Sequence, residues 1–154
     1  MKVIAYKDPE TGALVVVHPT PEYVALCLAD EENHSLMKLA EQVIPKGVPF
    51  VIMDADAVPE DRYFRNAWDL DDTEITVNLE KAREIQMDNI RRARDEKIKE
   101  LDLETLKGND VQKEKQRLRD LPQTIDLSAA KTLDELKSIW PDGLKKAIAD
   151  EDRN

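Results

Sequence analysis

The stretch VPFVIMDADAVPEDRYFRNAWDLDD, Val48–Asp72, decides how this chain is organised. It opens with an apolar run over Phe50–Met53, continues through an acidic segment marked by proline, and ends in a cluster of aromatic and arginine residues. The run has the composition of a β-strand, and we expect it to pair with strands that precede it. Pro59 followed by two acids is typical of a helix start. We therefore expect a short helix on which Phe64 and Trp68, four residues apart, share one face.

Four large side chains are the expected structural anchors of this region. Phe64 and Trp68 should fix the short helix to the N-terminal sheet, beside Phe50 and Ile52, because buried aromatic side chains contribute most to a small core.

The acids of the stretch do not predict a calcium site. A calcium loop needs regularly spaced oxygens around a glycine, and this stretch contains no glycine. We interpret it as a solvated acidic loop.

The N-terminal third predicts a β-hairpin followed by two short helices. Two apolar runs, Lys2–Lys7 and Ala13–His18, are separated by the turn residues DPETG. The second run contains LVVV without alternation, which predicts that at least one strand is covered on both faces. Thr20 should cap a helix that ends near Leu28, and Ser35 should begin the next helix.

The sequence after residue 78 predicts a pair of charged helices. The first extends from Leu79 to about Leu106, or roughly 42 Å at 1.5 Å per residue. Asn109 and Gln112 have the spacing of a capping box for the second helix, which Pro122 should end. Because only a short turn separates the two helices, we expect an antiparallel αα-hairpin.

The C-terminal part predicts shorter elements. Thr132 and Glu135 form a capping box before a short helix, and a last helix is expected from Gly143 to about Ala149. Trp140 is large for so small an element. We expect it to pack on the helical hairpin. The alternative, that Trp140 faces a partner protein, stays open.

These elements predict an α+β fold class in three parts. The parts are a small α+β domain over residues 1–77, a charged helical hairpin over 78–122, and an extended segment with short helices over 123–154. Charge is unevenly distributed, because residues 1–78 carry 6 Lys and Arg against 15 Asp and Glu, whereas 79–121 carry 12 against 11. An acidic chain repels phosphate, so nucleic acid is not an expected partner.

The residue types that carry chemistry are few and isolated. Cys27 lies among apolar neighbours and is expected to be a small buried hydrophobe; a single cysteine excludes an internal disulfide and a thiolate zinc site. His18 and His34 are two isolated histidines without a ligand set. We therefore expect no enzyme activity, catalytic residue, cofactor, metal or small-molecule substrate. No apolar run approaches the ~20 residues that span a bilayer, so no membrane partner is expected.

Five segments together resemble a family of small proteins encoded by tailed bacteriophages and prophages, among their tail and tail-fibre genes. The segments are GVPFVIMD at 47–54, PEDRYFRNAW at 59–68, KAREI at 81–85, LRDL at 118–121 and TLDELKSIWP at 132–141. The resemblance covers nearly the whole chain and is weakest over Glu22–Glu41. It implies no catalytic residue.

The resemblance implies a protein that acts by contact, as a structural or adaptor component of the virion tail or fibre. A transient tail or tail-fibre assembly chaperone is the alternative, and a phage inhibitor of a host protein is a second one. The partner would be a tail or tail-fibre protein, or a second copy in a homo-oligomer. The expected location is the host cytoplasm during assembly and, for a virion component, the tail.

The long helix carries a narrow stripe of apolar residues that recur every eleven positions, the period of an almost straight helix. The stripe consists of Leu79, Ala82, Ile90, Ala93 and Leu101. It is narrower than the apolar face of most buried helices, and its alanines would let another helix approach closely. We expect it to be the partner-binding face. The alternative is full coverage by the C-terminal segment through Ile139 and Trp140.

Overall fold

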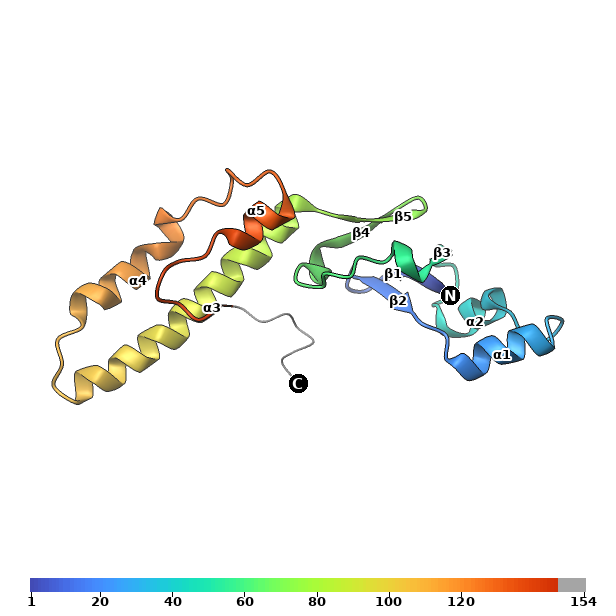
Figure 1. Cartoon of the computed structure of the whole chain (residues 1–154), viewed down its shortest axis with the longest axis horizontal. Coiled ribbons are helices and arrows are strands. Elements are labelled where there is room, and N and C mark those ends of the chain that lie inside the picture. Colours follow the sequence, from blue (N-terminus) through green and yellow to red (C-terminus); the bar gives the residue numbers. More distant parts are fainter. Residues whose placement is uncertain (147–154) are drawn as a thin grey trace. The chain divides into compact units, whose positions relative to one another are not determined.

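The computed structural model describes residues 1–146, and the fold is mixed α+β (Figure 1). The chain divides into two compact units, Met1–Asn78 and Leu79–Asn154. The first unit contains β1 (Lys2–Lys7), β2 (Leu14–Val17), α1 (Pro21–Ala29), α2 (Leu36–Val43), β3 (Phe50–Asp54), the 3-10 turns η1 (Ala55–Ala57) and η2 (Arg65–Ala67), β4 (Trp68–Asp71) and β5 (Glu74–Val77). The second contains α3 (Leu79–Leu106), α4 (Gln112–Thr124) and α5 (Leu133–Ser138). Within the described residues, every helix is too short or too polar to cross a membrane.

The first unit is built on an antiparallel sheet with the strand order β2-β1-β3. The hairpin and the third strand are confirmed. β1 lies in the centre, and its Ile4 is paired with Val17 on one side and with Ile52 on the other. Val3, Ile4 and Ala5 are fully buried, so the strand covered on both faces is β1.

The two faces of the sheet are covered by different parts of the chain. Successive side chains of a strand point to opposite faces, so Val3 and Ala5 face one cluster and Ile4 faces the other. The first cluster consists of Val3, Ala5, Leu14, Met53, Val58 and Trp68. The second consists of Ile4, Ala40 and Ile44, with Phe50 and Ile52 packed against it.

Polar side chains close the turns and begin the helices as expected. Asp8 accepts hydrogen bonds from the Glu10 N–H at 3.0 Å and the Thr11 hydroxyl at 2.8 Å, which hold the turn of the hairpin. These two bonds, the Glu10 bond first, lower the pKa of Asp8. Thr20 caps α1 through its side-chain oxygen, which confirms the predicted cap. Ser35, where the next helix was predicted to begin, caps α2 through its side-chain oxygen.

The predicted helix between Pro59 and Trp68 is wrong. The segment is irregular and contains a single 3-10 turn, and Trp68 is the first residue of β4. Asp61 accepts a hydrogen bond from the Tyr63 N–H at 2.9 Å. Such a local bond offers the backbone an alternative to helix, and Trp68 pairs with Val77 in a β4–β5 ribbon instead.

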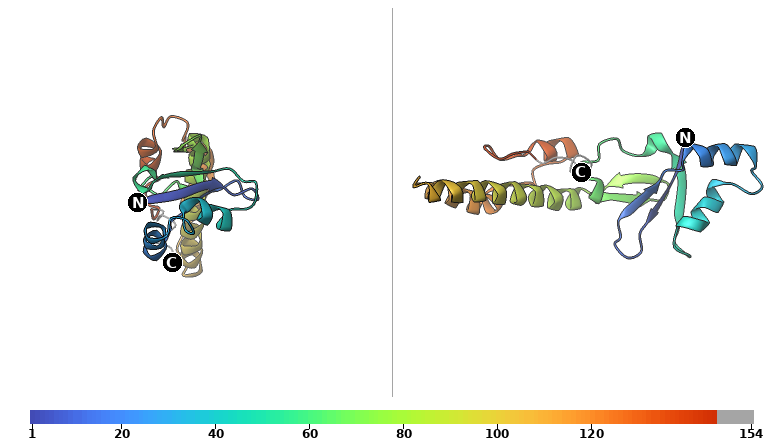
Figure 2. Two further views of the ribbon diagram at one scale, coloured as in Figure 1. Left: turned by 90° about the vertical axis from the view of Figure 1, so that its right-hand side faces the viewer. Right: turned by 90° about the horizontal axis from the view of Figure 1, so that it is seen from below.

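This change of element also moves Trp68 to the other face of the sheet from its predicted neighbours. Trp68 and Phe64 are both buried, with 5% and 3% of their surfaces exposed. Trp68, however, packs with Met53, whereas Phe50 and Ile52 pack on the side of α2. The expected placement beside Phe50 and Ile52 is therefore wrong. Figure 2 shows the β4–β5 ribbon beside the β1–β2 hairpin, against which it packs.

The second unit begins with the helical hairpin. α3 has the predicted bounds, and α4 returns along it in the antiparallel sense (Figure 1). A buried lysine, Lys115 of α4, connects the two helices. Its ammonium group lies 2.6 Å from a carboxylate oxygen of Asp102 and donates to the Thr105 hydroxyl at 3.0 Å.

Both ends of α4 differ from the prediction. The Asn109 side chain donates to Glu104 at 2.7 Å, and Val111 occupies the cap position, so the predicted capping box is wrong. The helix also continues past Pro122 to Thr124. A proline removes only one hydrogen bond in the last turn, and the Leu121 carbonyl next to it accepts bonds from Thr124 and from residue 125.

The C-terminal segment folds back on α3. The predicted cap of α5 is confirmed, because the Thr132 hydroxyl accepts from the Glu135 N–H, and the Glu135 carboxylate accepts from the Lys131 N–H. Trp140 is half-buried and donates its indole N–H to the Leu144 carbonyl at 3.1 Å. The helix expected from residue 143 to about 149 is not formed over 143–146, and its remainder lies outside the described residues.

Replacing Trp68 with alanine should destabilise the first unit by about 3–5 kcal/mol, the range for losing a buried Trp or Phe. Native-state hydrogen exchange of the β1 and β3 amides measures the change. Leu28→Ala is the control, because Leu28 is exposed and surface substitutions stay within about 0.5 kcal/mol. Equal protection in the two variants would show that Trp68 does not support the sheet.

Removing the two partners of the Lys115–Asp102 ion pair should have unequal effects. The Lys115 side chain is 8% exposed and that of Asp102 is 58% exposed. Lys115→Met leaves a hydrated carboxylate and should lower the free energy of unfolding by about 1 kcal/mol or less. Asp102→Ala leaves a buried ammonium group and should lower it by roughly 3 kcal/mol.

Urea denaturation followed by far-UV circular dichroism measures both losses. The double variant Lys115→Met/Asp102→Ala serves as the control, since it removes the buried charge and should recover most of the stability lost in Asp102→Ala. If the two single variants lost the same stability, Lys115 would be solvated in the folded protein.

Candidate functional site

The predicted partner-binding stripe of α3 is covered by the chain itself. Ala82, Ile90, Ala93 and Leu101 are buried, and Leu79 is half-buried. α4 and α5 both pack against α3 (Figure 1). Both α4 and the C-terminal segment therefore lie against α3. The stripe offers no open face to a partner in the described part of the structure.

Two polar side chains that the apolar pattern does not include attach the C-terminal segment to α3. Gln86 is fully buried and donates to the Ile139 carbonyl at 2.9 Å. Arg83 donates to the Ala130 carbonyl at 2.9 Å. Gln86 lies four residues from both Ala82 and Ile90, which places it on the same face. That spacing is the signal that the face is wider than its apolar members.

The residues that could carry chemistry stay apart. Cys27 is half-buried on α1 rather than buried. His34 stacks edge-on against Tyr23 with 6.0 Å between ring centroids. Within residues 1–146, no group of three His, Cys, Asp or Glu side chains has a metal-binding arrangement.

Two shallow hollows lie in the first unit, and Phe50 contributes to both. One, of about 430 Å³, is lined by Ile44, Val48 and other residues of the connection between α2 and β3. The other, of about 310 Å³, is lined by Lys7, Val51, Leu70 and neighbouring residues. The lining of each hollow is mainly apolar and includes two charged side chains, Glu41 and Lys46 in the first and Lys7 and Asp72 in the second. Catalytic sites instead bring several titratable groups together in a cleft.

The most unusual surface of the first unit is apolar. Structure is described for every residue of α1, and none of them is buried. Leu26 and Leu28 are 46% and 79% exposed, and Met37 and Val43 of α2 are exposed as well. The sequence indicates a largely apolar helix here. Because such a composition is ordinarily typical of a buried helix, it gave no sign that α1 would be left uncovered.

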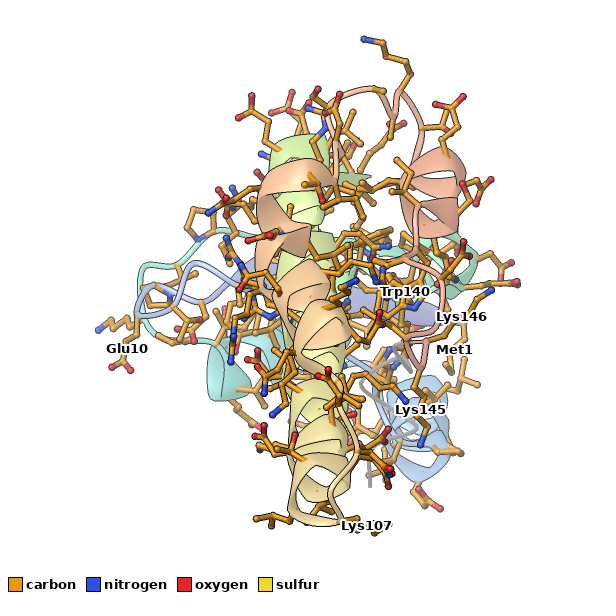
Figure 3. The ribbon with its side chains drawn as sticks, turned by 90° about the vertical axis from the view of Figure 1, so that its left-hand side faces the viewer. Met1, Glu10, Lys107, Trp140, Lys145 and Lys146 are labelled. Carbon is orange, nitrogen blue, oxygen red and sulfur yellow. The ribbon has the colours of Figure 1, made fainter. Side chains whose placement is uncertain are left out.

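A second, smaller apolar surface lies at the end of the helical hairpin. Leu103 and Leu106 are exposed and stand three residues apart in the last turns of α3. Lys107 follows them, and Figure 3 shows it at the far end of the hairpin. Residues with this spacing share a helix face, so the two leucines form one exposed pair.

Carboxylates next to α1 are held in the ionised form. The pKa of Asp30 is lowered, chiefly by the hydrogen bond from the Asn33 amide, which donates at 2.9 Å. The pKa of Glu22 is lowered by the backbone N–H at its own position and then by the Thr20 hydroxyl. The surface around the exposed leucines therefore remains negatively charged at neutral pH.

Comparisons of the chain with protein-family models, curated proteins and solved structures give no match.

Replacing Ile90 with aspartate should unfold the second unit, because Ile90 is fully buried within its own chain and an unpaired buried charge is strongly destabilising. Far-UV circular dichroism and sedimentation measure helicity and assembly state together. Leu106→Asp on the exposed end of α3 is the control and should retain helicity. An Ile90→Asp protein that kept its helices but lost an oligomer would place the stripe at an interface.

Proposed function

We propose that this protein is a bacteriophage tail-associated protein that acts by protein–protein contact, as a structural or adaptor component of the tail or fibre. The phage context is supported by the five sequence segments that resemble small proteins encoded among tail and tail-fibre genes. The mode of action is supported by one structural observation, the uncovered apolar surface of α1 and α2.

That surface supports contact with a protein because its large apolar side chains are exposed to solvent. Of the seven large apolar side chains exposed in the described part of the chain, four belong to these two consecutive helices: Leu26, Leu28, Met37 and Val43. Single exposed apolar residues are ordinary, but several on adjoining elements are typical of an interaction site.

The second unit supports a structural role by its construction. α3 has 28 residues, which corresponds to roughly 42 Å. Its buried face is closed by α4 and the C-terminal segment, and its outer surface carries paired charges such as Arg91 with Asp88 and Lys97 with Glu100. Such a unit can serve as a spacer that needs no further partner to fold.

A non-enzymatic role is part of the proposal. The carboxylates with shifted pKa values in residues 1–146 are all lowered, by ion pairs or by hydrogen bonds of turns and caps. Lowered values at exposed sites are typical of groups that stabilise local structure. A general acid at neutral pH requires a raised value in a cleft.

A transient assembly chaperone is the second candidate. The observation that favours it is the combination of an exposed apolar surface and an acidic first unit, which would mask an aggregation-prone segment of a tail or fibre protein and keep it dispersed. The two candidates differ in one respect only, which is whether the protein remains in the finished particle.

Mass spectrometry of purified virions tests the proposed function. We expect the protein in the particle at a fixed ratio to the major tail protein across independent preparations. Infected-cell extracts serve as the control for expression. Abundance in the extract with absence from virions would support the chaperone, and absence from every phage-infected extract would contradict the phage setting.

A further inference from the structure

We propose that the outward face of α1 binds a cationic amphipathic helix of a partner protein. This rests on the proposed function in one respect, that the protein acts by contact with another protein. The binding face is defined by Ala25, Leu26, Leu28 and Ala29 and is called the α1 face below.

The α1 face is continuous around the outside of the helix. At 100° per residue, the half-buried residues Tyr23, Val24 and Cys27 fall on one side of α1. Exposed residues occupy the opposite side, where two alanines lie one turn apart between the two leucines and Glu22 lies beside them. Because the alanine side chains are small, the side-chain ridge of a second helix can approach this side of α1 closely.

α1 is fixed in place although its outer side is uncovered. The Thr20 hydroxyl accepts the Tyr23 N–H at 3.2 Å and so caps the first turn. The Tyr23 hydroxyl donates to the Ser35 carbonyl at 3.1 Å, which fastens the inner side of α1 to the start of α2. Leu26 and Leu28 therefore lie on a helix that is already ordered in the free protein. A partner does not have to order the helix before binding.

The charges next to the α1 face determine the partner's chemistry. Glu22 lies in the first turn of α1, and Asp30, Glu31 and Glu32 follow directly after its last residue. The only basic residue between positions 18 and 44 other than histidine is Lys38, whose ammonium group donates to the Glu32 carbonyl. A partner must therefore combine an apolar stripe with lysine or arginine beside it.

The same charges disfavour the other occupants. A second copy would bring its own acids against these acids, and like charges facing each other across an interface oppose association. An anionic lipid surface would be repelled in the same way, because surface binding of proteins to such membranes relies on basic residues. Packing of an amphipathic helix through its apolar side is an established mode of recognition, and a basic amphipathic helix meets both requirements of the α1 face.

A titration of the full-length protein with a designed peptide tests this proposal. The probe is a fluorescein-labelled 18-residue helix with leucine on one face and lysine on the other, and binding is followed by fluorescence anisotropy. Two matched peptides carry glutamate in place of lysine, or serine in place of leucine. We expect the Leu/Lys peptide to bind, and both matched peptides to bind at least about tenfold more weakly.

Variants of the protein locate the binding face. Leu26→Ser/Leu28→Ser should weaken binding of the Leu/Lys peptide by at least about tenfold. Leu103→Ser/Leu106→Ser, at the end of α3, is the matched control and should bind like wild type. Ala25→Lys is a second test that retains a good helix former, and it should weaken binding through charge repulsion and because the longer side chain prevents close approach of the peptide. Circular dichroism confirms that each variant is folded.

Three outcomes would overturn the proposal. They are equal binding of the Leu/Lys peptide by the α1 variants and wild type, equal binding of the Leu/Glu peptide, and a wild-type dimer that Leu26→Ser/Leu28→Ser converts to monomer. The last would assign the α1 face to a second copy.

The peptide titration and the virion mass spectrometry test the two proposals separately. If virions contain the protein but the peptide does not bind as expected, the proposed function is retained and its contact surface lies elsewhere. If the peptide binds as expected but virions lack the protein, the α1 face is retained as a binding surface and the role in the tail is not.

Discussion

The burial of β1 on both faces is the constraint on which the first unit depends. Val3, Ile4 and Ala5 are all inaccessible to solvent, so each side of the sheet needs its own cover. α2 supplies one cover through Ala40, and the β4–β5 ribbon supplies the other through Trp68. Both covers pack on β1, and the outer side of α1, with Leu26 and Leu28, stays exposed.

The second unit solves a related problem with few apolar residues. The face of α3 that turns inward contains Gln86 and Asn89 as well as Ile90 and alanines. A buried amide is tolerated only when it is hydrogen-bonded, and Gln86 is bonded to the Ile139 carbonyl. The hydrogen bond of Gln86 thus attaches the C-terminal segment to α3 at Ile139, a directional contact that apolar packing alone would not provide.

A structural feature could be predicted from the sequence where the residues that specify it lie close together along the chain. The bounds of α3, the hairpin and the caps at Thr20, Ser35 and Thr132 were predictable, because propensity and cap chemistry act within a few residues. The helix expected before Trp68 failed because a tertiary requirement, cover for β1, outweighed a local helix start. Coverage of the α3 stripe was predictable only as an alternative, since it depends on bonds to distant residues, such as the bond from Gln86 to the Ile139 carbonyl, which leave no apolar period.

The exposed α1 face could not be found from the sequence for a different reason. A helix that is apolar on all sides is ordinarily a buried one, and the sequence alone therefore suggests an interior element. In the structure, the inner side of α1 is bonded to the start of α2 through Tyr23, whereas Leu26 and Leu28 are exposed, so α1 is not an interior element of this unit. Under the proposal that a partner helix covers this side of α1, burial and charge select the partner together. An apolar helix without cations would leave the bordering acids without counter-charges, and a cationic segment without an apolar side would leave the leucines in water.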